Sequence, residues 1–351
     1  MTRRSLASML VFGLLVVLLA MATLLPVPYV ALSPGPTVDV LAESGDKPII
    51  TVRGHRTYPT KGDLRLTTVS VTSPGREIGL GEAMAAWLDG TRAVQPREVY
   101  YPSDRSVEDV ERESTVEMVS SQDTAIAAAL TELGYSLPLQ IEVLDVTDGS
   151  PADGELRTRD RLLQVNGVRI TRVQQVSEAI QRTGVGKPAE FVVRRGSATR
   201  DLTLTPEASA DDPERAVVGV QIGTGYDFPF DVSVRINDDI GGPSAGLIFS
   251  LGVYDTLTPG ALTGGVDIAG TGTITAKGRV GPIGGIQQKI VAAADAGAKV
   301  FLVPPDNCDT AVHADVTKDE IRLVKAATLH SAVTSLETYA RDRSADLPAC
   351  G

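Results

Sequence analysis

The stretch Gly241-Gly242-Pro243-Ser244-Ala245-Gly246 places a serine in a glycine-rich turn directly before an apolar, helix-like run. A second stretch, Gly284-Gly285-Ile286-Gln287-Gln288-Lys289, places a single lysine inside another mostly apolar helical run. Serine becomes a nucleophile when a base takes its proton, and lysine can be that base only if its pKa falls towards neutrality. Burial among aliphatic side chains lowers a lysine pKa, because the charged form loses its hydration. The aliphatic residues around Lys289 are Ile286, Ile290, Val291 and 292–294. We therefore predict a hydrolase that uses Ser244 and Lys289.

Each of these residues also has a simpler interpretation. Serine commonly opens a helix as its N-cap, so Ser244 could have that role alone. A single lysine such as Lys289 is more often an exposed helix charge than a base. The occurrence of both stretches in one chain favours the nucleophile–base pair over two unrelated structural residues.

Composition narrows the classes of partner and cofactor. The chain has 351 residues and a formal net charge of -11, so a phosphate-backbone partner such as nucleic acid is not expected. Its histidines are His55, His313 and His330, and none lies beside a recognisable nucleophile turn. There is no Cys/His spacing typical of a zinc site, and we expect neither a metal nor a cofactor.

The N-terminus carries an almost unbroken apolar run from Leu6 to Leu25, preceded by Arg3 and Arg4. About 20 apolar residues are enough for a helix to span a bilayer, and the basic flank predicts a cytoplasmic N-terminus. We therefore predict a single-pass membrane anchor with the bulk of the chain outside the cytoplasm. A cleaved signal peptide is the alternative, although the run has no good Ala-x-Ala site.

The only two cysteines are Cys308 and Cys350. An even pair outside the cytoplasm can form a disulfide, which would join the C-terminal tail to the segment after Val303. Two unpaired thiols are the alternative, and the sequence does not choose between them.

Mixed strand and helix patterns predict a multidomain chain of the α+β or α/β class. After the stub and apolar helix in residues 1–30, residues 31–136 read as an α/β region that is a candidate to pack on the C-terminal domain. Its predicted elements are strands at 49–52 and 64–71 and helices at 107–118 and 124–133, the first capped by Ser106 and Asp109. Residues 137–207 form a compact β-rich module, and 208–351 form a further domain after the boundary at Asp211-Asp212-Pro213.

The module at 137–207 resembles a PDZ domain. The resemblance rests on Gly149-Ser150-Pro151-Ala152, on Leu162-Leu163-Gln164-Val165-Asn166-Gly167, and on the amphipathic helix predicted at 173–182. PDZ domains bind an extended peptide as an added strand, so the resemblance implies a peptide partner. The nearest candidate for the carboxylate-binding loop is Gly134-Tyr135-Ser136-Leu137, which departs from the usual pattern. A structural spacer is the alternative.

The segment from Gly241 to Pro304 resembles the proteolytic domain of Lon-type serine proteases. Four motifs occur in the family's order: Gly242-Pro243-Ser244-Ala245-Gly246, Thr271-Gly272-Thr273-Ile274-Thr275, Gly281-Pro282-Ile283-Gly284-Gly285 with Lys289, and Ala296-Gly297-Ala298-Lys299 before Leu302-Val303-Pro304. The order of anchor, PDZ module and Lon-type domain resembles the membrane-anchored bacterial PDZ–Lon proteases.

The resemblance implies a role for each matching residue. Ser244 matches the nucleophile, Lys289 the general base, and Thr271 a threonine that supports the lysine. Peptide N–H groups of the turn at Gly241, Gly242 and beyond would suit a developing oxyanion. The sequence departs from the family where Gly241 replaces an acidic residue, with Asp238 and Asp239 just upstream, and where Thr273 replaces a glutamate.

The resemblance further implies an ATP-independent peptidase that acts on flexible proteins or peptides, because the Gly-x-x-x-x-Gly-Lys-Ser/Thr motif of the Lon ATPase motor is absent from this sequence. A homo-oligomeric ring is implied by resemblance only. The main alternative is a non-catalytic adaptor that holds partners through the PDZ-like module. A second Ser-x-x-Lys match, Ser44 to Lys47, lacks the companion motifs of penicillin-binding proteins and is taken as chance.

Overall fold

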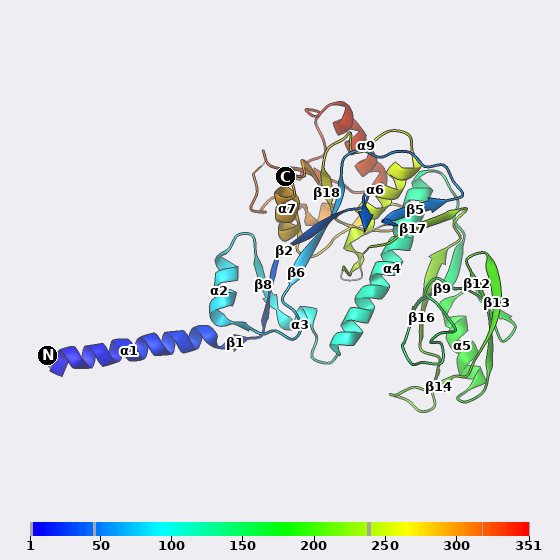
Figure 1. Cartoon of the computed structure of the whole chain (residues 1–351), viewed down its shortest axis with the longest axis horizontal. Coiled ribbons are helices and arrows are strands. Elements are labelled where there is room, and N and C mark those ends of the chain that lie inside the picture. The colour runs from blue at the N-terminus through cyan, green and yellow to red at the C-terminus, as the bar shows by residue number, and fades with distance from the viewer. Residues whose placement is uncertain (1–2, 45–46, 237–239, 318, 351) are drawn as a thin grey trace.

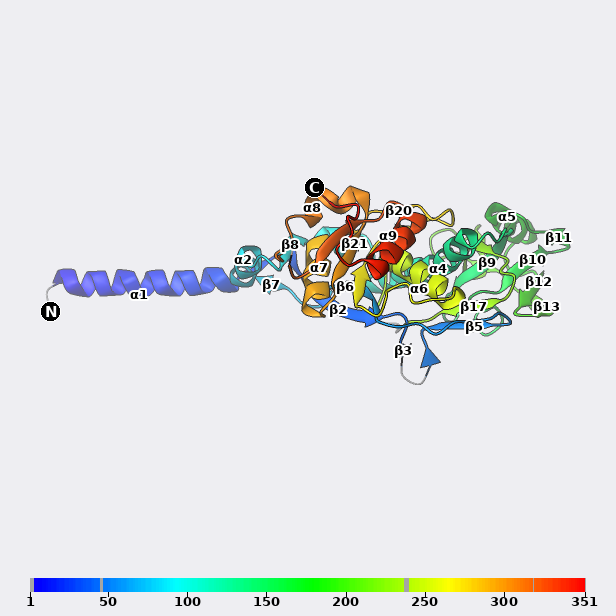
Figure 2. The ribbon, with the colours of Figure 1, turned by 90° about the horizontal axis from the view of Figure 1, so that it is seen from above.

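The computed structural model describes residues 3–44, 47–236, 240–317 and 319–350. Helix α1 (Arg3–Leu24) projects from one end of an elongated molecule, a body built on a mixed sheet lies at the centre, and a smaller β-rich module lies at the opposite end (Figure 1). The view from above shows these parts in the same order along the long axis (Figure 2).

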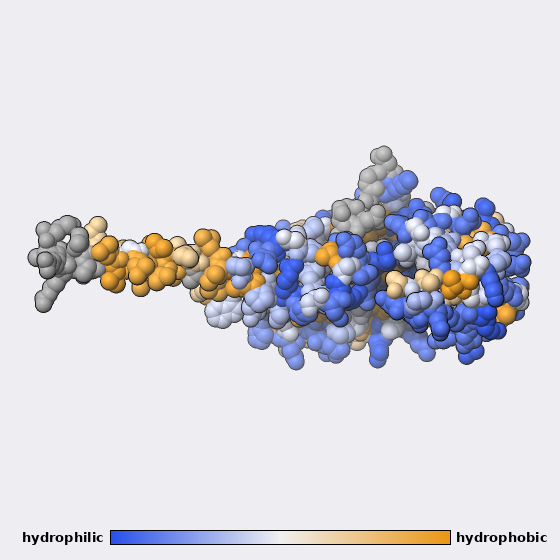
Figure 3. All heavy atoms as spheres, turned by 90° about the horizontal axis from the view of Figure 1, so that it is seen from below, coloured by the Kyte–Doolittle hydropathy of each residue, from blue (hydrophilic) through white to orange (hydrophobic). Residues whose placement is uncertain are grey.

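The apolar run at the N-terminus forms the projecting helix α1, and apolar side chains such as Phe12, 68% exposed, line its surface (Figure 3). The prediction that this run crosses a membrane is wrong. Such a crossing needs about 20 consecutive, mainly apolar residues, and no helix in the described ranges meets that requirement of length and apolarity. The same finding corrects two related predictions, which are the transmembrane helix in the fold class and the single-pass membrane localisation.

The central body is built on a mixed sheet with the strand order β22-β21-β18-β6-β2-β8. β6, β18, β21 and β22 are parallel, whereas β2 is antiparallel to both its neighbours. Since β6 pairs with β18, one sheet unites chain segments from both sides of the PDZ-like region. The strands are β2 (Tyr29–Asp39), β6 (Leu64–Val71), β8 (Ala93–Pro96), β18 (Ile268–Gly270), β21 (Val300–Val303) and β22 (Arg322–Lys325).

Helices cover both faces of this sheet. On β21, Val300 and Leu302 belong to the core shared with α4, α6 and α9, whereas Phe301 and Val303 belong to the core shared with α7 and α8. Successive side chains of a strand point to opposite faces, so a strand buried on both faces is a continuous apolar run. The helices are α4 (Val107–Glu132), α6 (Gly246–Leu257), α7 (Ile286–Asp295), α8 (Cys308–Ala311) and α9 (Leu329–Arg341).

Helix α4 is one continuous helix where the sequence predicts two. The predicted cap is confirmed, because the Ser106 side chain accepts a hydrogen bond from the Asp109 N–H. The polar run at 120–124 contains no glycine or proline, so nothing in it breaks the helix. Ser121, Gln122 and Asp123 are buried because α4 packs against α6 and also against β9 and β16 of the second sheet.

The second sheet has the order β13-β12-β10-β9-β16, with β11 beside β10, and helix α5 (Val173–Thr183) packs against it. We call residues 139–226, which build it, the PDZ-like module. The predicted hairpin turn is confirmed, with positive φ at Asn166 (50°) and Gly167 (74°). β16 pairs with β9, so 220–226 joins this sheet although the sequence reading assigns it to the next domain. The strands are β9 (Leu139–Val146), β10 (Arg161–Val165), β11 (Val168–Arg169), β12 (Ala189–Arg195), β13 (Ala198–Leu204) and β16 (Val220–Tyr226).

Short elements complete the body. β5 (Ile50–Arg53) pairs with β17 (Asp231–Val234) between the two sheets, and β19 (Thr273–Ile274) pairs with β20 (Val280–Gly281). The remaining short elements are β1 (Pro26–Val27), β3 (Glu43–Ser44), β4 (Lys47–Pro48), β7 (Ile78–Gly79), α2 (Leu80–Leu88), α3 (Arg97–Tyr100), β14 (Glu207–Ala208), β15 (Ala216–Val217), and the 3₁₀ turns η1 (Pro243–Ala245) and η2 (Pro305–Asn307).

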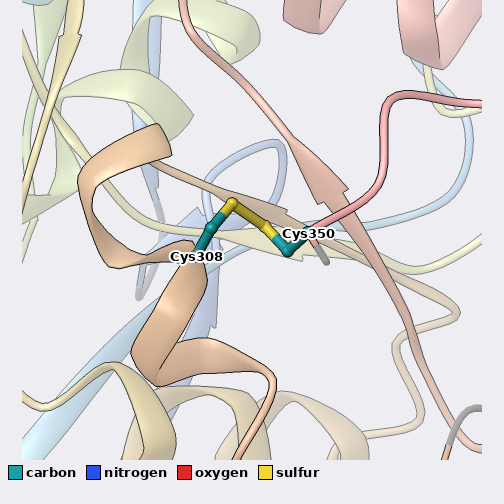
Figure 4. Close-up of a disulfide and its surroundings, with 2 residues drawn as sticks. All are labelled: Cys308 and Cys350. Atoms are coloured by element: carbon teal, nitrogen blue, oxygen red, sulfur yellow. A yellow bond between two sulfur atoms is a disulfide. The ribbon is translucent and has the colours of Figure 1, made fainter.

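Cys308 and Cys350 form a disulfide that joins the start of α8 to the C-terminal segment (Figure 4). The sequence leaves this pairing open. A main-chain hydrogen bond from the Lys325 N–H to the Pro348 carbonyl (2.7 Å) also holds the segment along β22. The disulfide and this hydrogen bond therefore hold the C-terminal segment against the body of the molecule.

Candidate active site

The candidate site lies at the carboxyl end of β18. Thr271 follows this strand directly, and Lys289 lies near the start of α7. In α/β sheets, the crevice outside the carboxyl ends of parallel strands is where functional side chains gather. Because α6 and α7 cover opposite faces of the sheet, this end is a place where residues from both helices can meet.

Ser244 lies in the 3₁₀ turn η1, which continues directly into α6. Gly242 precedes the turn with φ +85°, a left-handed conformation that glycine adopts without strain. The Ser244 carbonyl accepts hydrogen bonds from the Gly272 N–H (2.8 Å) and from the Thr271 hydroxyl (3.0 Å). These hydrogen bonds hold the turn at 241–245, which we call the nucleophile turn after its predicted role, against the loop that follows β18.

The three predicted side chains meet. The Lys289 Nζ lies 2.8 Å from the Ser244 Oγ and 3.1 Å from the Thr271 Oγ1. Since the Thr271 hydroxyl donates to the Ser244 carbonyl, its oxygen is free to accept an N–H from the amine. In the neutral form of Lys289, this arrangement leaves the nitrogen lone pair for the hydroxyl proton of Ser244.

Burial sets the acidity of this amine. Lys289 is 4% exposed, and desolvation lowers its pKa from the ordinary lysine value to about 8. Ile286, Ile290 and Ala293 from the same helix are buried in the adjoining core. A large fraction of neutral amine near pH 8 is what a general base requires.

Some main-chain N–H groups of the nucleophile turn already donate hydrogen bonds within the protein. The Gly242 N–H donates to the Ser114 carbonyl of α4 (3.3 Å), and Pro243 has no N–H. The N–H of Ser244 is therefore the next main-chain donor after Gly242 in this turn. Asp238 and Asp239 lie outside the described residues.

Helix α4 supplies contacts that the sequence reading does not identify. Besides Ser114, the Ser121 hydroxyl donates to the Pro243 carbonyl (3.1 Å). Neither serine lies in a recognisable motif, and both are over 100 positions from the nucleophile turn. The one available signal is that uncharged polar residues lie between the charged first half of the helix and its apolar second half.

The PDZ-like module has a groove between α5 and the segment 216–222. It encloses about 750 Å³, and β16, which forms one wall, is the edge strand of its sheet. The predicted carboxylate loop at 134–137 is not part of this groove, because Tyr135 packs on Phe230, with ring centroids 5.7 Å apart. Apolar residues that line the groove include Val176, Ile180, Val218, Val220 and Ile222.

A serine hydroxyl beside a buried lysine amine, held at the carboxyl end of an α/β sheet, is the arrangement expected of a serine peptidase with a Ser–Lys pair. Comparison with protein families identifies two domains in this chain. Residues 237–336 match the Lon protease (S16) C-terminal proteolytic domain, and residues 142–195 match the PDZ domain. The chain therefore contains a Lon-type serine peptidase domain and a PDZ domain. Helix α4 lies outside both matched ranges.

Similar curated proteins are Lon proteases. The Lon protease of Brucella suis biovar 1 (strain 1330) is 27% identical over 253 residues, which is 66% of this chain and 30% of that protein. The Lon protease of Azorhizobium caulinodans is 29% identical over 179 residues, 49% of this chain and 20% of that protein. That of Desulforamulus reducens is 46% identical over 66 residues, 19% of this chain and 8% of that protein. The chain thus spans 30% or less of the length of these relatives.

Similar solved structures are isolated PDZ domains. The PDZ domain of an SdrC-like protein from Listeria innocua is 19% identical, covers 24% of this chain and 92% of that chain, and gives a TM-score of 0.22. The PDZ domain of the SdrC-like protein from Listeria monocytogenes is 18% identical, covers 24% of this chain and 86% of that chain, and gives the same TM-score of 0.22.

Proposed function

We propose that this chain is an ATP-independent endopeptidase that cleaves flexible proteins or peptides with Ser244 as nucleophile and Lys289 as general base. The observation that carries the proposal is the 2.8 Å separation between the Ser244 Oγ and the Nζ of a lysine that is 4% exposed. Burial supports the neutral amine, and Thr271 holds it towards the hydroxyl.

The residues perform an acyl transfer in two halves. The neutral Lys289 amine takes the Ser244 hydroxyl proton while the Oγ forms a bond to the scissile carbonyl carbon. The tetrahedral intermediate collapses as the C–N bond breaks, and the lysine ammonium gives its proton to the leaving amine. Water then attacks the acyl-enzyme, with Lys289 as base, and releases a carboxylate product and free Ser244. The Ser244 N–H is our candidate donor to the developing oxyanion.

The PDZ-like module is proposed to recruit the substrate. Among the described residues, β16 has no strand paired to its outer side, and α5 lies across the groove from it. An extended peptide can add to such an edge through main-chain hydrogen bonds and place alternate side chains against the apolar wall. Replacement of Val220, a partly exposed residue of the groove, by aspartate should raise KM for a protein substrate and leave cleavage of a short peptide unchanged.

The proposal is tested with purified chain, an unstructured protein substrate and no nucleotide. Ser244→Ala and Lys289→Ala should each abolish cleavage, whereas Lys277→Ala, which removes an exposed lysine of the same domain, should not. Cleavage that requires ATP would reject the ATP-independent part, and undiminished cleavage by either dyad variant would reject the assignment of the pair.

A serine-reactive phosphonate separates the peptidase from a non-catalytic adaptor. The peptidase should be labelled at Ser244, and labelling should disappear in Lys289→Ala. An adaptor with a degenerate site would remain unlabelled at every pH. A ring-shaped oligomer stays a prediction, to be checked by the mass of the purified chain in solution.

A further inference from the structure

The nucleophile turn rests on one face of helix α4. Ser114 accepts the Gly242 N–H through its carbonyl (3.3 Å), and the Ser121 hydroxyl donates to the Pro243 carbonyl (3.1 Å). Residues seven positions apart in an α-helix are separated by about two turns and share a face. One face of α4 therefore forms hydrogen bonds with two successive residues of the turn, Gly242 and Pro243.

We propose that Ser121 is a positioning residue that fixes the direction of the Ser244 N–H. This inference rests on the proposed peptidase function. The Pro243 carbonyl and the Ser244 N–H belong to one peptide unit, and no described peptide bond is cis. A trans peptide is planar, so its C=O and N–H point in opposite directions. When Ser121 holds the carbonyl towards α4, the N–H of Ser244 points away from α4.

The close fit between the turn and α4 supports this role. Ser121 is 7% exposed, so its hydroxyl is shielded from competing water. A Cβ added to Gly246 would lie 3.3 Å from the Ser121 Oγ, and one added to Gly241 would collide with the Ser114 Oγ. Glycine at both positions lets the turn approach the helix closely.

An N–H group that is already oriented stabilises the transition state most when it points to the atom where negative charge develops. Removal of one oxyanion donor typically lowers kcat about 100- to 1000-fold. Ser121 would not contact the oxyanion itself and acts only by orienting the peptide unit. We therefore expect its removal to lower kcat by roughly 10-fold or more, which is less than the loss of a donor. Because it does not touch Lys289, the pH at which activity rises should stay the same.

The experiment uses Ser121→Thr and Ser121→Val in the full chain. Both substitutions add nearly the same volume, but only threonine keeps a hydroxyl, so packing effects cancel in their comparison. We expect Ser121→Val to lose kcat roughly 10-fold or more relative to Ser121→Thr, with KM and the pH midpoint unchanged. Equal kcat values for the two variants would overturn the proposal.

Two further measurements separate positioning from stability and from the proposed function. A peptide boronate forms a tetrahedral adduct that carries an oxyanion-like oxygen. Ser121→Ala should weaken boronate binding by a larger factor than it changes KM. Equal factors for boronate binding and KM would contradict the inference. Ser120→Ala, at the adjacent position on α4, is the matched control and should keep parental kcat. If Ser244→Ala retained activity, the peptidase assignment itself would fail, and this outcome is distinct from a failure of Ser121 alone.

Discussion

The amine of Lys289 lies 2.8 Å from the hydroxyl of Ser244, although 45 positions separate these residues in the chain. Ser244 lies in the turn before α6 and Lys289 lies in α7, and these two helices cover opposite faces of the central sheet. The same amine also donates a hydrogen bond to the Thr271 hydroxyl, so the proposed base contacts both the proposed nucleophile and a residue that can orient it.

The buried amine predicts a rising pH profile. Since desolvation holds the Lys289 pKa at about 8, the protonated and inactive form predominates below that pH. We expect kcat/KM to rise about 10-fold per pH unit on the acid side and to level off above about pH 8. Initial rates with a fluorogenic peptide between pH 6 and 10 measure this. A flat profile across that range would contradict a lysine base.

The Thr271 hydroxyl predicts a loss of turnover when it is removed. Thr271→Val abolishes both the hydrogen bond from Lys289 and the one to the Ser244 carbonyl, while it preserves the side-chain shape. Because the amine would lose its orientation, we expect kcat to fall roughly 10- to 100-fold. Thr271→Ser keeps the hydroxyl and serves as the control. Equal activity of the valine and serine variants would show that the hydroxyl has no such function.

The junction between α4 and the PDZ-like module contains a buried carboxyl pair, Asp123 and Glu142. Both line a cavity of about 1150 Å³, and Arg159 forms an ion pair with Asp123 (2.9 Å). Burial first, and then the Asp123 charge, raise the pKa of Glu142 to about 7, and burial also raises the pKa of Asp123. The folded protein therefore binds the Glu142 proton more tightly than the unfolded chain does.

This shift predicts stability that declines as the pH rises. The contribution of Glu142 is complete below its unfolded pKa of about 4.5 and is lost as the pH passes through about 7. Glu142→Gln, which mimics the protonated form, should remove this dependence. Thermal midpoints at pH 5 and pH 8 should differ by a few degrees more in the parent than in the variant. An identical pH dependence in both would disprove the assignment.

The disulfide predicts sensitivity to reductant. Cys308 and Cys350 are 42 positions apart, and a cross-link of that span stabilises a fold by up to about 4 kcal/mol in the chain-entropy account. We expect dithiothreitol to lower the thermal midpoint of the parent chain. The double variant Cys308→Ser/Cys350→Ser should start from the lower midpoint and not respond to reductant. A parent midpoint that stays constant after thiol assay shows full reduction would contradict this expectation.

Much of the candidate site follows from local sequence. Ser244, Lys289 and Thr271 lie in short motifs whose glycines and apolar neighbours dictate a turn and a buried helix, and the strand at 64–71 is found as predicted. The continuous helix α4 is not predicted, because its polar middle looks like a break until its burial partners are known. The apolar run at 6–25 does form a helix, but the predicted membrane span is wrong, because no helix in the described ranges is long and apolar enough to cross a bilayer.

The sequence by itself determined which three side chains to propose as nucleophile, base and supporting residue, because side-chain chemistry and motif spacing are local properties. Only the tertiary structure decided that β16 belongs to the PDZ-like sheet, that Cys308 meets Cys350, and that Ser114 and Ser121 hold the nucleophile turn. The physical reason is that strand pairing and hydrogen bonds across long sequence separations depend on which surfaces the fold brings together, and no short segment carries that information.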